Sequence, residues 1–496
     1  MSSSIRGVEL PEGRSGSSFL HELLQHAAQA FPADLDAARL TPDPKRFRDS
    51  FADDVIRFEA ARAASPRRVE IALAIRRHAA TRLRFVDEGG SRPFAEVMAA
   101  PAEALATRAL TTRGPGRLTP GVTSGGVRRT HAALRAWLLE ANTQRHLTDA
   151  ARIRVEALLD RADADGGTLS LAGERFVLMG AGAELAPTRL LLAAGADVLW
   201  LDVRDPPASL FERDDLGGTL HIPATPANLL THPAAIASTI RRFAEDGPVH
   251  LGMYAYAGGE SQEFRLTASM NGILRSLPAS AVRSMALLIS PTTASVCSPE
   301  DLAVAEARLR TAPAWQRALA SVGVLKPAGV RSGDGRVAFA IVPLQGASYQ
   351  AAQYIGKVMS AETHAVYGPT LGDTPAPMTV SANTAPITNT ASLNHPLFQA
   401  GFLAAPRWGI LISEPATTTE LNGLLAIADV TDPSAPGAAT QAYATPADRA
   451  RALFREQVHG GLFAQPYGIY GEIQVAATIG LTQKPSLLGQ LITGRR

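Results

Sequence analysis

Apolar residues recur three and four positions apart over most of the first 165 residues. This spacing places apolar side chains on one face of a helix. It occurs in "SFLHELLQHAAQAF", "SFADDVIRFEAARAA", "RRVEIALAIRRHAATRLRF" and "TDAARIRVEALLDRA". The last of these segments begins at Thr148 or Asp149, and either residue can cap a helix. We therefore predict an N-terminal all-α domain over residues 1–165, interrupted by a loop at "TTRGPGRLTPGVTSGG".

Beyond the boundary segment "DADGGTLSLAGE", short apolar runs alternate with helical patterns. The runs are "RFVLMG", "DVLWLD", "GTLHIP", "VHLGMYAYAG", "SMALLIS" and "MTVSAN". Strands without a polar face are typical of a parallel sheet that helices cover on both sides. We predict an α/β domain with a doubly wound, Rossmann-like parallel sheet over residues 166–435, with a helical insertion near 297–335. The Pro-, Ala- and Gly-rich segment "DPSAPGAATQAYATPAD" separates it from a C-terminal helical tail, residues 436–496.

Composition adds limits to this picture. With 496 residues, 46% of them hydrophobic, the chain can build the cores of two or three domains. Its formal net charge is +2, and almost all basic residues are arginine, which together with the alanine content is typical of a GC-rich bacterial genome. Arginines recur among acidic residues at helical spacing, as at Arg67, Arg68, Arg76 and Arg77. This pattern predicts a solvated or salt-bridged helix face and gives no indication of nucleic-acid binding.

The cysteine content, the apolar segments and the histidine positions exclude several classes of protein and of site. A single cysteine, Cys297, excludes an intrachain disulfide and a cysteine-based zinc site, so we expect a cytoplasmic protein. The N-terminus lacks a signal-peptide core, and no segment reaches the roughly 18 uncharged apolar residues of a membrane span. Histidines are scattered without a metal-type pair, so we expect no metal site; they include His221, His232, His364, His395 and His459.

Candidate chemistry begins at "RFVLMGAGAELAPTRLLLAAGADVLWLDVRD", residues 175–205. Gly180 and Gly182 follow the first strand, where glycine lets the backbone approach a pyrophosphate. Leu185 stands at the third position of the G-x-G-x-x-G pattern, so the fingerprint is incomplete. The predicted cofactor loop is completed by Ala181 and Glu184.

The end of the second strand indicates which cofactor fits this loop. Asp202 would bond the ribose hydroxyls of NAD and repel a 2′-phosphate, whereas Arg204, two residues later, favours NADP. We therefore expect NAD, with NADP as the alternative. S-adenosylmethionine sites share both features, and the glycines could also serve the turn alone.

Two later segments resemble the short-chain dehydrogenase/reductase family over about residues 175–432. "LQGASYQAAQYIGKVMSAETHAV" resembles the family's active-site helix, with Tyr349 at the tyrosine position. "MTVSANTAPITNT" resembles the strand and loop that follow this helix, with Pro386 and Thr390, or Thr388 in a shorter alignment. "AYAG" resembles the stretch after the fourth strand; Ala257 and Gly258 match it, while Tyr256 replaces an asparagine.

The resemblance implies roles for the residues around Tyr349. The tyrosine would exchange a proton with the carbonyl or alcohol oxygen, and Ser290 or Thr292 would orient that oxygen. The family's lysine position holds Gln353, which supplies no positive charge. Lys357 lies eight residues after Tyr349, about two helical turns, and shares its face. A Tyr354–Lys357 pair, a solvent-facing Lys357 and a purely structural Tyr349 are the alternatives.

Three functions follow from these patterns. The first is an NAD(P)-dependent oxidoreductase that acts on a carbonyl or alcohol of a largely apolar small molecule. The second is a catalytically degenerate protein that binds a dinucleotide as a sensor or scaffold. The third is an S-adenosylmethionine-dependent methyltransferase, which the tyrosine and threonine segments disfavour. We expect a small-molecule substrate, no nucleic acid and no membrane span, and the oligomeric state stays open.

Overall fold

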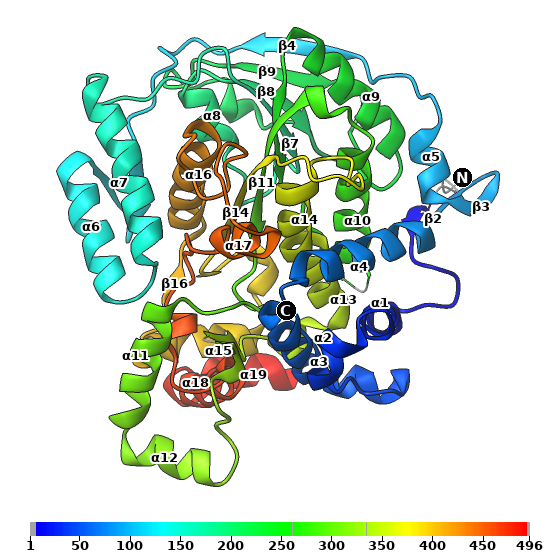
Figure 1. Cartoon of the computed structure of the whole chain (residues 1–496). Coiled ribbons are helices and arrows are strands. Elements are labelled where there is room, and N and C mark those ends of the chain that lie inside the picture. The colour runs from blue at the N-terminus through cyan, green and yellow to red at the C-terminus, as the bar shows by residue number, and fades with distance from the viewer. Residues whose placement is uncertain (1–5, 260, 334, 494–496) are drawn as a thin grey trace.

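A seven-stranded, mostly parallel sheet forms the centre of the computed structural model, which describes residues 6–259, 261–333 and 335–493 (Figure 1). Its strand order is β14-β11-β10-β7-β8-β9-β4. Six strands are parallel and coincide with the six predicted apolar runs: β7 (Arg175–Met179), β8 (Asp197–Leu201), β9 (Thr219–Pro223), β10 (Val249–Met253), β11 (Val282–Ile289) and β14 (Thr379–Thr384). The chain is therefore an α/β protein, as predicted.

Both faces of this sheet are buried. Successive side chains of a strand point to opposite faces, and in β7 Val177 and Met179 join one hydrophobic cluster while Phe176 and Leu178 join another. This arrangement explains why the strands read as continuous apolar runs.

Each face has its own set of helices. One face packs against α9 (Pro233–Phe243), α10 (Gln262–Arg275), the π-helix η6 (Ala351–Val358) and α14 (Met359–Tyr367). The other packs against α7 (Asp149–Ala164), α8 (Thr188–Ala193) and α16 (Pro415–Thr431). In Figure 1, α6 (His131–Thr143) and α7 flank the sheet on the left, and α4 (Arg68–Arg82), α10 and α14 lie on the right.

The first 165 residues contain the predicted helices but are not all-α. The predicted helices are α1 (Gly16–Ala30), α3 (Pro44–Ala64), α4 (Arg68–Arg82) and α7, which Thr148 caps. Five short strands and the edge strand accompany them: β1 (Gly7–Glu9), β2 (Arg84–Asp87), β3 (Gly90–Pro93), β5 (Gly121–Ser124), β6 (Val127–Thr130) and β4 (Thr107–Thr111). They escaped prediction because they are short, and most of them have no apolar run.

The N-terminal segment contacts the sheet in two ways, by strand pairing and by hydrophobic packing. Strand β4 pairs antiparallel with β9 at the sheet edge. Helices α1, α3 and α4 contribute Phe19, Phe58 and Ile71 to the same hydrophobic cluster as β7 and β10. The domain boundary near residue 165 stays a prediction.

The insertion between β11 and the π-helix contains the two predicted helices, α11 (Pro299–Arg310) and α12 (Ala314–Ser321). An antiparallel hairpin, β12 (Gly329–Ser332) and β13 (Gly335–Ala338), follows them. The C-terminal segment is helical, with α17 (Pro446–Ala452), α18 (Ile469–Gln483) and α19 (Pro485–Thr493). Helix α18 packs against α15 (Pro396–Ala404).

The predicted arginine face is wrong in one respect. Arg67 and Arg77 are exposed enough to form surface ion pairs, but Arg68 and Arg76 are buried. Arg68 bonds to Glu362 of α14, whereas Arg76 bonds only to neutral groups. Helical spacing alone did not distinguish the buried arginines of α4 from the exposed ones, because burial depends on which segments pack against the helix. None of the helices within the described ranges is long and apolar enough to cross a membrane.

A buried carboxyl pair connects α16 to the C-terminal segment. Asp429 of α16 accepts hydrogen bonds from Ser381 (2.6 Å) and from Asn383 (3.1 Å), and it lies beside Glu456. Arg154 of α7 donates to Glu456 at 3.0 Å. Burial, together with the nearby Asp429 carboxylate, raises the pKa of Glu456 to about 9.

This pair predicts a pH dependence of folding. Glu456 binds its proton more tightly in the folded state than in the unfolded chain, where its pKa is about 4.3. The free energy of unfolding should therefore decrease as the pH rises from about 4.3 towards about 9. Glu456→Gln should flatten this part of the profile in urea titrations at several pH values. Glu140→Gln, at an exposed position, should leave it unchanged; equal slopes in wild type and Glu456→Gln would contradict the assignment.

Candidate functional site

The predicted site residues meet at one edge of the sheet. Parallel strands end at the same edge, so the segments after β7, β8, β10, β11 and β14 lie there together. Strands β7 and β10 are neighbours, although β8 and β9 come between them in the chain. The strand order therefore reverses between β7 and β10. Helix α8 covers one face of the sheet, and helices α9 and α10 cover the other.

The glycine loop begins with a close backbone contact at this point. Gly180 has a φ of +88°, and a Cβ there would lie 2.3 Å from the Ala255 Cα. Only glycine fits this position, because of both the left-handed backbone and the approach of the segment after β10. Contacts within the protein thus explain why position 180 must be glycine, without a bound pyrophosphate.

The rest of the loop is also internally bonded. The amides of Ala183 and Ala186 close turns, and Ala181 accepts a hydrogen bond from Thr188 at 2.6 Å. Glu184 bonds the Ala391 amide at 3.3 Å. Leu185 is half-buried. A pyrophosphate would therefore have to use the remaining amides of the loop.

Asp202 connects the two strand ends. One carboxylate oxygen accepts the Gly182 N–H at 3.0 Å, and the other accepts the Arg204 N–H at 3.0 Å. Each oxygen keeps a further acceptor position for a ribose hydroxyl. Gly182 and the Arg204 side chain are exposed, and Val203 between Asp202 and Arg204 is 54% exposed. An apolar side chain thus stands free beside the carboxylate.

The segment after β10 is also open. Tyr256 is 49% exposed and Gly258 is exposed. Ala257 is half-buried and donates its N–H to Glu263 at 2.9 Å. This segment lies between the glycine loop and Tyr349, since Gly180 contacts Ala255 and Tyr256 contributes to the electrostatics of Tyr349.

Tyr349, Ser290 and Thr292 form the centre of the site. The hydroxyl groups of Ser290 and Thr292 lie 2.9 Å apart. Burial raises the pKa of Tyr349, and hydrogen bonding by Ser290 and Thr292 opposes that shift. Tyr349 as a whole is partly exposed, although its hydroxyl is in a buried environment. The structure thus brings together the tyrosine and both hydroxyl residues that the sequence suggested.

Behind this centre lies a buried polar chain. Gln353 accepts the Ser290 N–H at 3.0 Å and donates to Glu263 at 3.3 Å. Lys357 lies near Glu263 and donates to the Leu288 carbonyl at 2.9 Å. Burial lowers the pKa of Lys357, and Glu263 opposes this shift. The solvent-facing alternative for Lys357 is wrong, since the residue is 6% exposed.

The sequence analysis did not identify Glu263 as a site residue. It lies in the first turn of α10, where an acidic residue is ordinary, and nothing in the sequence places it between Gln353 and Lys357. It is buried, and that burial raises its pKa. The only signal was its position just after the "AYAG" segment.

The helix that carries Gln353 and Lys357 is a π-helix. Eight-residue π-helices are rare, and π-type turns occur often at functional sites. A Cβ at Gly356 would lie 2.5 Å from the Thr267 hydroxyl oxygen, so glycine allows η6 to pack closely against α10. Gln353 of the same π-helix also reaches α10, through its hydrogen bond to Glu263.

The remaining predicted residues are placed differently. Pro386 and Thr388 are buried, and the Thr388 hydroxyl bonds Thr418 of α16 at 2.8 Å. Tyr354 points away from Ser290, and its hydroxyl donates to Glu59 of α3 at 2.5 Å. The alternative Tyr354–Lys357 pair is therefore wrong, because a π-helix and a buried Glu59 direct Tyr354 into the core.

Three buried histidines have hydrogen-bond partners outside this site. His250 bonds Ser284, His459 bonds Asp301, and His364 bonds the Gly368 carbonyl. In the part of the chain that the structure describes, no group of three or more His, Cys, Asp or Glu side chains could hold a metal ion.

Comparison of the sequence with protein-family models gives no match, and comparison with curated proteins gives none either. Assignment of a function must therefore depend on the geometry of the site.

Proposed function

We propose that the chain binds a nicotinamide dinucleotide at the carboxyl edge of its sheet and reduces a carbonyl group of a largely apolar small molecule. The observation that carries this proposal is the position of Tyr349 beside Ser290 and Thr292, next to the point where the strand order reverses. In doubly wound sheets, ligands bind in the crevice at such a point.

The strand order supports a Rossmann-like assignment. Numbered from β7 along the chain, the parallel strands lie in the order 3-2-1-4-5-6, which is the dinucleotide-binding arrangement. The glycine loop follows the first strand of this series and Asp202 follows the second. The resemblance to short-chain dehydrogenases rests on the same positions.

The residues around Asp202 fit the adenosine half of NAD. Its carboxylate can accept ribose hydroxyls while it holds the Gly182 and Arg204 amides. The exposed Val203 offers an apolar surface for a base. The carboxylate would repel a 2′-phosphate, so NAD is the preferred cofactor, with Arg204 as the residue that favours NADP.

In the proposed reduction, Tyr349 would be the proton donor. When bound, the nicotinamide ring supplies the hydride. A phenol is protonated at neutral pH, so Tyr349 can donate a proton to the substrate oxygen. Burial raises its pKa further, which makes Tyr349 a weaker acid. Ser290 and Thr292 would position that oxygen.

Gln353, Glu263 and Lys357 would act as positioning residues. The Ser290 amide is held by Gln353, and Gln353 is held by Glu263. Lys357 balances the charge of Glu263 and is not among the groups that lower the pKa of Tyr349. This last observation favours the second candidate function, a protein that binds the dinucleotide without turnover.

Calorimetric titration with NADH, NADPH and S-adenosylmethionine tests the proposal. We expect saturable binding of NADH, and Asp202→Ala should weaken it by about tenfold because the ribose loses a charge-assisted hydrogen bond. Asp205→Ala is the control, because this exposed aspartate is close in sequence to Asp202. Binding of S-adenosylmethionine alone would overturn the proposal, whereas NADH binding without turnover of any ketone would leave the second candidate.

A further inference from the structure

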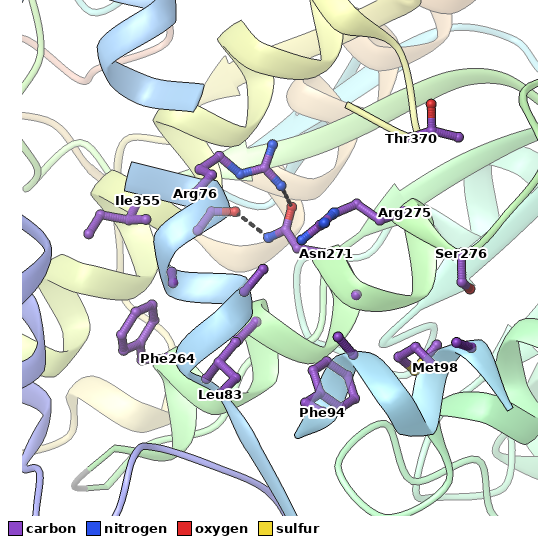
Figure 2. Close-up of a pocket in the computed structure, with 17 residues that line it drawn as sticks. Arg76, Leu83, Phe94, Met98, Phe264, Asn271, Arg275, Ser276, Ile355 and Thr370 are labelled. Atoms are coloured by element: carbon purple, nitrogen blue, oxygen red, sulfur yellow. Dashed lines mark hydrogen bonds between the residues drawn. The ribbon is translucent and has the colours of Figure 1, made fainter. Parts of the chain in front are cut away.

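A cavity lies beside α10 and the π-helix η6, and its lining residues are not those of the candidate site. Its volume is about 260 Å³, and it lies between α4, α5 (Phe94–Ala99), α10 and the π-helix η6. Its walls are mostly apolar, with Leu83, Phe94, Met98, Phe264 and Ile355 among the lining residues (Figure 2). Figure 2 shows Leu83, Phe94, Met98 and Phe264 below a polar group formed by Arg76, Asn271 and Arg275, with Ile355 to the left of this group.

Two arginines line this apolar cavity without a counterion. Arg76 is buried, and it donates to Asn271 (2.6 Å), to Thr363 and to His364 (3.1 Å), all of them neutral acceptors. The Nε atom of Arg275 is buried without a hydrogen-bond partner. Among the described residues, no carboxylate oxygen lies within 4.0 Å of either guanidinium, and no acidic residue lines the cavity.

This arrangement is costly for the protein alone. A buried charge is normally paired, because removal of its hydration is unfavourable. Burial and the neighbouring Arg275 lower the pKa of Arg76, and burial and Arg77 lower that of Arg275. Arg77 itself is paired with Asp373. An anion at Arg76 and Arg275 would compensate all of these effects.

We propose that this cavity binds a medium-chain aliphatic carboxylate, with its carboxylate at Arg76 and Arg275 and its chain against Phe94, Met98 and Phe264. The volume suits such a ligand, since an apolar cavity of about 150 Å³ already accommodates benzene. A planar guanidinium is the side chain best suited to a carboxylate.

The arginine end of this cavity is distant from the candidate site, whereas the lining also includes Phe264 and Gly356, the chain neighbours of Glu263 and Lys357. Glu263 and Arg275 are 12 residues apart on α10, which corresponds to about 18 Å along the helix axis. Asn271 connects the two regions, because it accepts from Arg76 and donates to the Gly356 carbonyl of η6 at 2.9 Å. Binding in the cavity would thus contact the helix that carries Gln353 and Lys357.

Calorimetric titration of the full chain with octanoate, acetate and 1-octanol tests the proposal. We expect saturable octanoate binding that is at least tenfold tighter than binding of either comparison compound, since each of these lacks one half of the ligand. Arg275→Met should weaken octanoate binding at least tenfold. Ala80→Phe, which fills the cavity from α4, should do the same.

Arg82→Met serves as the matched control, because Arg82 lies on the same helix, pairs with Glu22 and does not line the cavity. Thermal melting of each variant verifies folding. Absence of octanoate binding to wild type, equal binding to Arg275→Met, or equal binding of 1-octanol would each overturn the proposal. None of these results depends on the dinucleotide site, because the titrations contain no cofactor.

Discussion

Tyr349→Phe is expected to lower kcat for ketone reduction by about 10²- to 10⁴-fold, the usual contribution of a positioned proton donor. The substitution removes the hydroxyl group beside Ser290 and Thr292 and keeps the ring. NADH affinity should stay within about twofold of wild type, because the phenol does not contact the Asp202 side of the site. Steady-state kinetics on a panel of aliphatic and aromatic ketones, together with NADH titration, measures both quantities.

Tyr443→Phe is the matched control. Tyr443 donates its hydroxyl to the Pro436 carbonyl in the segment that packs near the start of β14, at the opposite end of the strand from the site. Its removal should leave kcat unchanged. If Tyr349→Phe retains more than half of the wild-type kcat, Tyr349 is a packing residue and the proposed proton donor is wrong.

Arg62→Met is expected to reduce the free energy of unfolding by about 3–5 kcal/mol, the cost of breaking a buried ion pair. Arg62 of α3 is fully buried and bonds Glu59 at 2.7 Å and Glu362 of α14 at 2.5 Å. Tyr354 completes the cluster through Glu59. Loss of the guanidinium would leave two buried carboxylates facing each other with only Arg68 between them. Urea denaturation followed by circular dichroism measures the change.

Arg67→Met, five positions along the chain, removes an exposed arginine that pairs with Asp34 and Glu70. It should cost no more than about 1 kcal/mol, as for other surface pairs. Equal effects of the two substitutions would show that the buried cluster does not stabilise the fold. Since Arg62 connects the N-terminal helices to α14, the same experiment reports whether these parts unfold in one transition.

Sequence patterns were sufficient to predict the strands of the sheet and the edge at which a site can form. The apolar runs at β7, β8, β9, β10, β11 and β14 have no polar face, and this property defines strands buried on both sides. Their chain order placed Gly180, Asp202 and Ser290 after strand ends, which parallel strands bring to one edge, whereas Tyr349 was predicted on a helix and reaches this edge only through tertiary packing. These are local and periodic properties, which a sequence displays directly.

Tertiary structure decided what each side chain contacts. Lys357 and Tyr354 lie three residues apart, yet η6 turns one towards Glu263 and the other towards Glu59, because a π-helix changes the helical periodicity. Glu263 belongs to the site because Gln353, distant in the chain, packs against it. Arg76 is buried without a counterion because α10 and α14 pack against α4. Charge and helical spacing describe one element at a time, whereas burial and pairing depend on the elements that cover it.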